Sequence, residues 1–206
     1  MRASFEEKDE ELLGRSLAGD EAAFCALYRR RQAGLYRFAL QMCGSEGVAE
    51  DVVQEVFMTL LRDGTQFDAA RGALSSYLYG IARNQVLRRL EKERPFVTLA
   101  DEKEDETGAD AFADARPDPL AELAQSELVE RVRGAVLTLP AHYREVVVLC
   151  ELHEMSYAEA AAVLGCAVGT VRSRLHRARA MLCERLSAYG GGEQTAKSFN
   201  AARCFA

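Results

Sequence analysis

The sequence predicts an all-α protein of two small helical domains joined by a flexible acidic linker. Apolar residues recur with helical spacing through residues 10–94, with weak breaks at 43–45 and 63–65, and again through 120–189. Strand-like alternation is absent, and the two periodic segments are separated by an acidic stretch poor in large apolar side chains. We therefore expect a first domain at 1–95, the linker at 96–119, a second domain at 120–189 and a disordered tail at 190–206.

The charge of the chain is unevenly distributed. The formal net charge of −6 over 206 residues argues by itself against a nucleic-acid partner. However, residues 99–127 hold ten acidic and two basic side chains, whereas residues 172–185 hold five Arg and one Glu. The average therefore hides one strongly basic helix.

Several classes of protein are not expected from this composition. No apolar run is long enough to cross a bilayer and the N-terminus is acidic, so we expect a cytoplasmic protein without membrane insertion. The six cysteines form no CxxC pair, and the three histidines have no spacing that suits a metal or a catalytic base. We therefore expect no metal, no cofactor, no catalytic residues and no enzymatic activity.

In the first domain, the segment AEDVVQEVFMTLL at residues 49–61 has one apolar and one polar face. Its apolar row, with helical spacing, consists of Ala49, Val52, Val53, Val56, Phe57 and Leu60. The opposite face carries Glu50, Asp51, Gln54 and Glu55, which would suit a basic partner helix. Spacing alone favours the plainer alternative of a solvated face.

The segment FDAARGALSSYLYGIARNQVLRRL at residues 67–90 reads as a loop followed by a helix. Arg83, Asn84 and Arg88 are interleaved with Tyr77 and Tyr79. Cations that hold phosphates, combined with aromatic rings that stack on unpaired bases, are typical of a nucleic-acid surface. A packing role for both tyrosines is the alternative.

In the second domain, the segment from Ser156 to Leu182 has the pattern of a helix-turn-helix. Ser156 and Glu159 form a capping box at the start of a short helix that ends at Gly165. The following helix has an apolar row and an outer face rich in arginine, which favours binding in a DNA major groove over a merely solvated basic helix. The expected buried row is Val168, Val171, Leu175, Ala178 and Leu182, and the outer residues are Arg172, Ser173, Arg174, His176, Arg177 and Arg179.

Four stretches, in this order, resemble the extracytoplasmic-function (ECF, group IV) sigma factors of the sigma-70 family. GDEAAFCALYRRRQAGLYRFAL is similar to the opening helices of that family, and AEDVVQEVFMTLL to its polymerase-docking helix. FDAARGALSSYLYGIARNQVLRRL resembles its promoter-melting and −10-reading segment, and SYAEAAAVLGCAVGTVRSRLHRARAML its −35-reading helix-turn-helix. The resemblance extends over most of residues 19–186.

The resemblance implies an alternative sigma factor that directs core RNA polymerase to −35 and −10 promoter elements, melts the DNA and starts transcription. Its implied partners are the clamp helices and flap of polymerase, double-stranded promoter DNA with its melted −10 strand, and an anti-sigma factor. A free-standing helix-turn-helix regulator of the LuxR type is the alternative. The implied contacts are Asp51, Gln54 and Glu55 for polymerase; Phe67, Tyr77, Arg83, Asn84 and Arg88 for the −10 element; and Thr170, Arg172, Ser173, Arg174, His176 and Arg177 for the −35 element.

Overall fold

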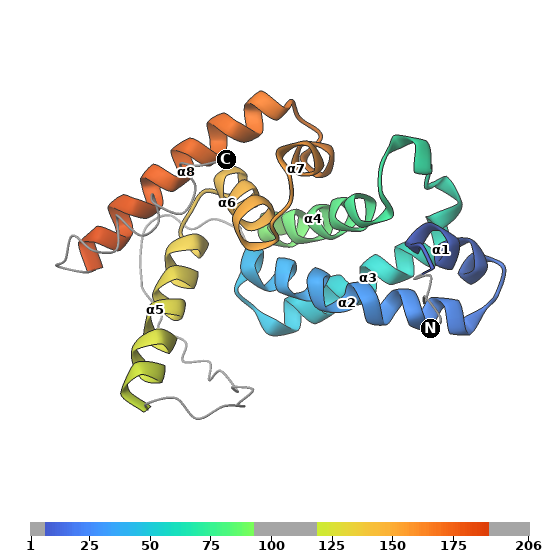
Figure 1. Cartoon of the computed structure of the whole chain (residues 1–206), viewed down its shortest axis with the longest axis horizontal. Helices are drawn as coiled ribbons and strands as arrows, with labels where there is room; N and C mark the ends of the chain where they lie inside the picture. Colours follow the sequence, from blue (N-terminus) through green and yellow to red (C-terminus); the bar gives the residue numbers. More distant parts are fainter. Residues whose placement is uncertain (1–6, 93–118, 190–206) are drawn as a thin grey trace, which may run out of the picture.

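The computed structural model describes residues 7–92 and 119–189, and all regular elements within these ranges are helices (Figure 1). The helices up to Lys92 form what we call the first domain, and those from Pro119 form the helix-turn-helix domain. The expected linker, apart from Pro119, and the expected tail lie outside the described residues. The first domain consists of α1 (Asp9–Leu17), α2 (Glu21–Cys43), α3 (Glu46–Asp63), two short 3₁₀ turns (Gly64–Gln66 and Ala69–Arg71) and α4 (Leu74–Lys92).

Local capping explains where the helices of the first domain begin and end. The Asp20 carboxylate accepts a hydrogen bond from the Ala23 amide at 3.1 Å and begins α2, and the Ser45 hydroxyl accepts one from the Val48 amide at 3.4 Å and begins α3. Gly44, with φ +74°, ends α2 in the left-handed conformation. The predicted breaks after Cys43 and Asp63 are confirmed, whereas the break between α1 and α2 was not predicted.

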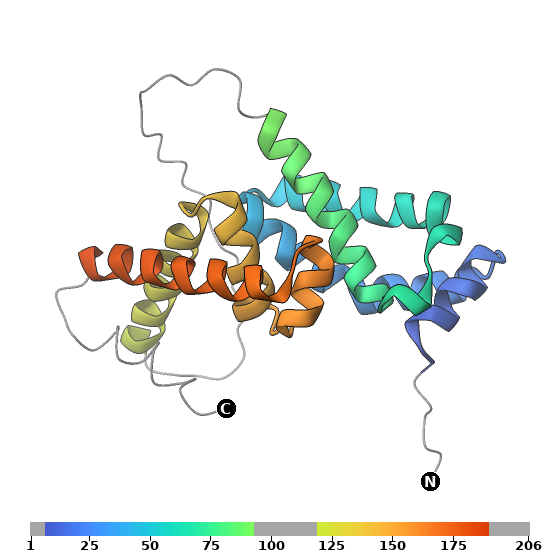
Figure 2. The same cartoon turned by 90° about the horizontal axis from the view of Figure 1, so that it is seen from above.

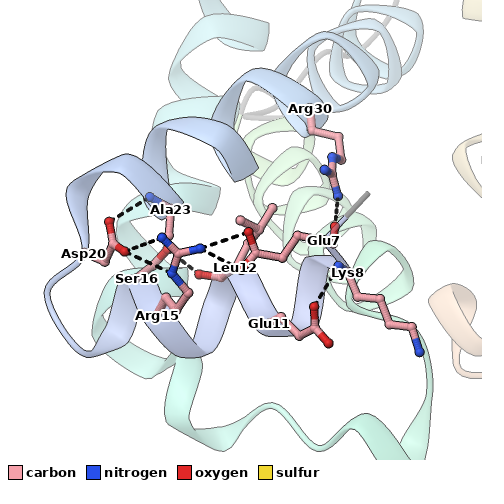
Figure 3. A network of polar contacts seen from close by, with 9 residues as sticks. All are labelled: Glu7, Lys8, Glu11, Leu12, Arg15, Ser16, Asp20, Ala23 and Arg30. Atoms are coloured by element: carbon pink, nitrogen blue, oxygen red, sulfur yellow. Dashed lines mark hydrogen bonds and ion pairs between the residues drawn. The ribbon is translucent and has the colours of Figure 1, made fainter. Parts of the chain in front are cut away.

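Ion pairs connect helix α1 to α2 and to the residues just before each helix (Figure 3). The Arg15 guanidinium contacts the carboxylates of Glu7, at 2.7 Å, and Asp20, at 2.6 Å. At the start of α1, Asp9 is 6% exposed and pairs with both Arg30 and Arg31 of α2. Two cations around one buried carboxylate satisfy its charge, so this contact fixes the angle between the helices.

The core of the first domain lies between α2, α3 and α4. All six residues of the predicted apolar row of α3 are buried, which confirms that row. Phe38 of α2 is fully buried and meets the ring of Tyr79 from α4 edge to face, at 5.4 Å between centroids. The polar face of α3 is therefore turned outward, which is what a docking surface requires.

The helix-turn-helix domain follows the predicted pattern closely. The predicted capping box is present: the Glu159 amide donates to the Ser156 hydroxyl at 3.2 Å, and the Ser156 amide donates to the Glu159 carboxylate at 2.9 Å. Gly165, with φ +62°, makes the turn. The domain consists of α5 (Pro119–Leu137), α6 (Ala141–Val147), one π-helical turn (Val148–Leu152), α7 (Tyr157–Leu164) and α8 (Val168–Tyr189).

The predicted buried row of α8 needs one correction. Val171, Leu175, Ala178 and Leu182 are buried, as expected, but Val168 is 36% exposed. Val168 is the first residue of α8, where no preceding turn of the helix covers its side chain.

The two domains pack directly against each other. Helix α4 lies beside α7, and α2 contacts α5, α6 and the π-helical turn (Figures 1 and 2). At the end of α2, Arg144 donates hydrogen bonds to the Met42 carbonyl of the first domain and to the Leu137 carbonyl of its own domain. Burial lowers the pKa of Arg144. One continuous apolar cluster extends through both domains.

Candidate polymerase and nucleic-acid interfaces

The outward face of α3 carries what we call the docking patch: Asp51, Gln54 and Glu55. Asp51 and Gln54 are exposed and Glu55 is half-buried. The Asp51 carboxylate lies 3.6 Å from the Arg89 guanidinium of α4, with 65% of the Asp51 side chain exposed. An exposed pair of this kind contributes at most about 1 kcal/mol and leaves the carboxylate accessible to a partner.

Next to the docking patch is an apolar hollow of about 620 Å³ between α2 and α3, which the sequence analysis missed. Tyr36, Phe57 and Met58 line it, and Gln54 of the docking patch forms part of its wall. Met58 and Leu61 on the same side are 58% and 44% exposed. An apolar floor bordered by polar groups is the usual anatomy of a protein-docking surface. The sequence held a signal for this hollow. Met58 and Leu61 are apolar, and each comes one residue after a member of the buried row of α3.

Four of the five expected −10 contacts share one side of the first domain. Phe67 lies between the two 3₁₀ turns, and its ring is 5.5 Å from that of Tyr77 between centroids. Asn84 and Arg88 are exposed and follow Tyr77 at seven and eleven residues, so the three lie on one face of α4. The pair of half-buried rings can hold an unstacked base, and the exposed amide and cation, about 10 and 17 Å farther along the helix, can contact other parts of the same strand.

The fifth expected −10 contact, Arg83, lies on a different face. Six residues after Tyr77, it is turned about 120° away around the helix. Its Nε donates to Oε1 of Glu145 in α6 at 2.7 Å, and the Arg83 side chain is only 22% exposed. The structure therefore separates Arg83 from the other four residues and joins it to the helix-turn-helix domain.

The expected −35 residues lie along the first half of α8. Arg172, Ser173, His176 and Arg177 are exposed, whereas Thr170 and Arg174 are half-buried. The Ser173 hydroxyl donates to the Thr170 carbonyl at 3.0 Å, so it is turned partly back toward its own helix. The exposed arginines present guanidinium groups suited to guanine edges and to phosphates.

Two arginines of α8 contact side chains outside that helix. The Arg172 guanidinium lies over the ring of Tyr157 in α7, 5.7 Å from the centroid. Arg179 forms an ion pair with Glu151 of the π-helical turn, so part of its charge is already paired within the domain. The contact with Tyr157 could not be predicted from helical spacing, because Tyr157 is 15 positions before Arg172 and lies in a different helix.

Within residues 7–92 and 119–189, no group of three His, Cys, Asp or Glu side chains is arranged to hold a metal ion. Within the same ranges, no helix combines the length and apolar character needed to span a membrane.

Comparison with known proteins identifies both halves of the chain. The family model described as Sigma-70 region 2 matches residues 27–96, and the one described as Sigma-70, region 4 matches residues 130–182. The ECF RNA polymerase sigma factor SigW of Bacillus subtilis is 32% identical over 171 residues, which are 82% of this chain and 91% of the relative.

Two solved structures are similar in both sequence and fold. CnrH of Cupriavidus metallidurans, solved in complex with the cytosolic domain of CnrY, has a TM-score of 0.66 and 29% identity, over 89% of this chain and all of the other. The sigma factor RpoE of Bartonella quintana, solved with the anti-sigma factor NepR, has a TM-score of 0.60 and 27% identity, over 80% of this chain and 96% of the other.

Proposed function

The chain belongs to the ECF RNA polymerase sigma factors of the sigma-70 family. On that basis we propose which of its surfaces binds polymerase and which surfaces bind the −10 and −35 promoter elements. It is an alternative sigma factor, which binds core RNA polymerase and directs promoter recognition, melting and initiation. A free-standing LuxR-type regulator finds no support, because the match to region 2 covers a domain that such a regulator would not need.

The docking patch binds the clamp helices of the largest polymerase subunit. Its accessible Asp51 carboxylate supplies negative charge for a basic helix, and the apolar hollow beside it supplies buried area. Gln54 borders both surfaces, so one partner helix would cover the charge and the hollow together. The flap of polymerase is the proposed partner of the helix-turn-helix domain.

The −10 element is read by the face of α4 that carries Tyr77, Asn84 and Arg88, together with Phe67 of the preceding loop. The ring pair receives a base that has left the duplex stack, and Arg88 holds a backbone phosphate farther along the same strand. Extruding a base costs a few kcal/mol, which these contacts and polymerase binding must offset because no ATP is used. Arg83 can contact DNA at this surface only after its ion pair with Glu145 is broken.

The −35 element is read by the N-terminal half of α8 in the major groove. Arg172 and Arg177 are the exposed cations suited to guanine edges or phosphates, with Ser173 and His176 between them. Thr170 and the half-buried Arg174 contribute backbone contacts at the groove edge.

Family membership supports three further proposals. The factor acts in the cytoplasm, where polymerase and promoter DNA are found. It contributes recognition rather than catalysis, so it is not itself an enzyme. An anti-sigma factor is its expected partner, as the Bartonella protein was solved in complex with the anti-sigma factor NepR.

The observation that carries this proposal is the match of Sigma-70 region 2 to residues 27–96 and of region 4 to residues 130–182, in one chain and in that order. The test is transcription in vitro with purified core RNA polymerase on a fragmented genomic library, with and without the protein. Specific new start sites that share −35 and −10 sequences are expected. Absence of initiation, together with DNA binding by the protein alone, would refute the proposal.

A further inference from the structure

The loop that carries Phe67 packs against α1 at the point where the loop begins. Residues 64–73 connect α3 to α4, and Gly64, the first of them, is buried. A Cβ built on Gly64 would lie 3.3 Å from the Leu17 side chain and 3.4 Å from that of Leu13, both in α1. The Phe67 amide donates to the Gly64 carbonyl at 3.1 Å. The backbone of Phe67 is therefore one hydrogen bond away from a residue that rests on α1.

The same helix also holds the end of this loop, through one hydrogen bond. The backbone amide of Leu74, the first residue of α4, donates to Oε1 of Glu10 in α1 at 3.3 Å, across 64 residues of sequence. The residue before Leu74 is Ala73, whose side chain has no hydrogen-bond acceptor. Because the first amides of a helix need acceptors from outside the helix, Glu10 supplies one that the local sequence lacks. Its negative charge also suits the positive end of α4.

These two contacts lie where the backbones of Phe67 and Tyr77 are anchored. Phe67 is bonded to Gly64, as described above, and the Tyr77 amide donates to the Ala73 carbonyl at 3.3 Å in the first turn of α4. The two rings are 5.5 Å apart between centroids. The separation of the rings depends on where each backbone lies, so α1 helps to set the space in which an unstacked base would be held.

Helix α1 is itself firmly attached, so it can act as a support. Leu12 and Leu13 are each only 3% exposed. Asp9, the neighbour of Glu10, is buried and pairs with Arg30 and Arg31 of α2. Charge-assisted contacts to a buried carboxylate restrict the start of α1, and with it the place of the Glu10 carboxylate. A loop whose two ends rest on a fixed helix has fewer conformations than a free one.

We infer that Glu10 is a positioning residue for −10 recognition, whose carboxylate fixes the first turn of α4 on α1 and so holds the Phe67 and Tyr77 rings ready for an extruded base. This inference rests on the proposed function of the ring pair. Helix α1 carries none of the proposed DNA or polymerase contacts, so Glu10 acts through the loop alone. When the rings are already in place, binding of a base does not have to order the loop, and less of the contact energy is lost.

Amide hydrogen exchange of the free full-length chain, followed by mass spectrometry, tests the anchoring. Glu10→Ala removes the acceptor, and exchange in residues 64–77 should become about fivefold faster, while exchange in α2 and α3 stays the same. Glu10→Gln loses the charge but keeps a side-chain oxygen, so it should recover most of the protection. Unchanged exchange in the Glu10→Ala protein would overturn the inference.

The matched control is Glu11→Ala, one residue farther along α1. The Glu11 carboxylate accepts a hydrogen bond from the Lys8 amide at 3.2 Å, so this variant removes the same charge and the same kind of bond, but at the start of α1 itself (Figure 3). Exchange in residues 64–77 should stay as in the unchanged protein. If Glu11→Ala and Glu10→Ala accelerated exchange there equally, the cause would be a general weakening of α1, and Glu10 would have no positioning role.

Transcription from a promoter recovered in the library assay supplies the second readout. With saturating holoenzyme, Glu10→Ala should lower initiation on duplex DNA about fivefold, and clearly less on the same promoter with an unpaired −10 region, because that template does not need base capture to open. Glu10→Gln should initiate nearly as well as the unchanged protein. Equal loss on both templates, or no loss on duplex DNA, would contradict the inference alone. If the unchanged protein itself does not initiate, the proposed function fails and this inference fails with it.

Discussion

The pH dependence of stability can be worked out for one interdomain residue, His153. Its ring is half-buried between Tyr79, Gln41 and the edge of Phe38. Burial, and to a smaller degree the positive charge of Arg37, lowers its pKa from 6.5 to about 4. The charged form of the ring is therefore disfavoured as long as the domains are packed together.

The direction of the effect follows from where the proton binds. When the domains separate or unfold, the His153 pKa returns to its ordinary value, so between pH 6.5 and 4 the separated form takes up the proton and the packed form does not. The stabilisation is complete above pH 6.5 and is lost as the pH falls toward 4. Between pH 7.5 and 5.5 these two pKa values give a loss of about 1.4 kcal/mol, which partial exposure of the ring reduces to ~1 kcal/mol.

The assay is urea unfolding of the full chain at pH 7.5 and 5.5. When the pH drops from 7.5 to 5.5, the free energy of unfolding of His153→Gln, which cannot titrate, should fall by ~1 kcal/mol less than that of the unchanged protein. His142→Gln is the control, since His142 is exposed and its ring contacts Tyr143 of the same domain. The same pH dependence in the unchanged protein and the His153→Gln variant would refute the reasoning.

Three further predictions concern the docking patch, α8 and one turn. Asp51→Arg should abolish core polymerase binding in a pull-down, while the helical content measured by circular dichroism is kept. Arg89→Ala, which breaks the same internal ion pair, should retain binding. Loss of binding in both variants would mean that the ion pair, rather than the docking patch, is needed for binding. Arg177→Ala should lower −35-dependent transcription by one or two orders of magnitude, corresponding to about 1–3 kcal/mol, without weakening core binding; equal loss of both would contradict its role. An alanine at Gly44, where φ is +74° and the added Cβ would lie 2.9 Å from the Leu137 side chain, should lower the free energy of unfolding by ~1–2 kcal/mol. Gly47→Ala, inside α3 with open space around it, should not, and equal effects in denaturant titrations would exclude both the left-handed conformation and this contact as causes.

Much of the fold and part of the site could be predicted because these features are local. The apolar row of α3 is set by the 3.6-residue repeat, and all its members are buried. The capping box of Ser156 and Glu159 and the turn at Gly165 each depend on residues only a few positions apart. The break at Gly19 and Asp20 was missed, although a glycine before an N-capping aspartate is itself a local signal.

The candidate site was predicted less completely, since an exposed face and a covered face look alike in a sequence. Arg83 has the charge of a DNA contact, and only the structure shows that it is bound to Glu145, 62 residues away. Likewise, Met58 and Leu61 look like ordinary members of an apolar helix until the packing of α2 on α3 leaves them beside a hollow.

The sequence by itself determined the helices, their caps and which face of each is apolar, because these depend on backbone geometry and on neighbours within one or two turns. The tertiary structure alone decided which polar side chains the other domain covers. The partners of His153 are 74 and 112 residues away, and no periodicity within a helix specifies contacts at such separations. For the same reason the sequence revealed two DNA-reading elements, and only the folded chain showed that they are packed together.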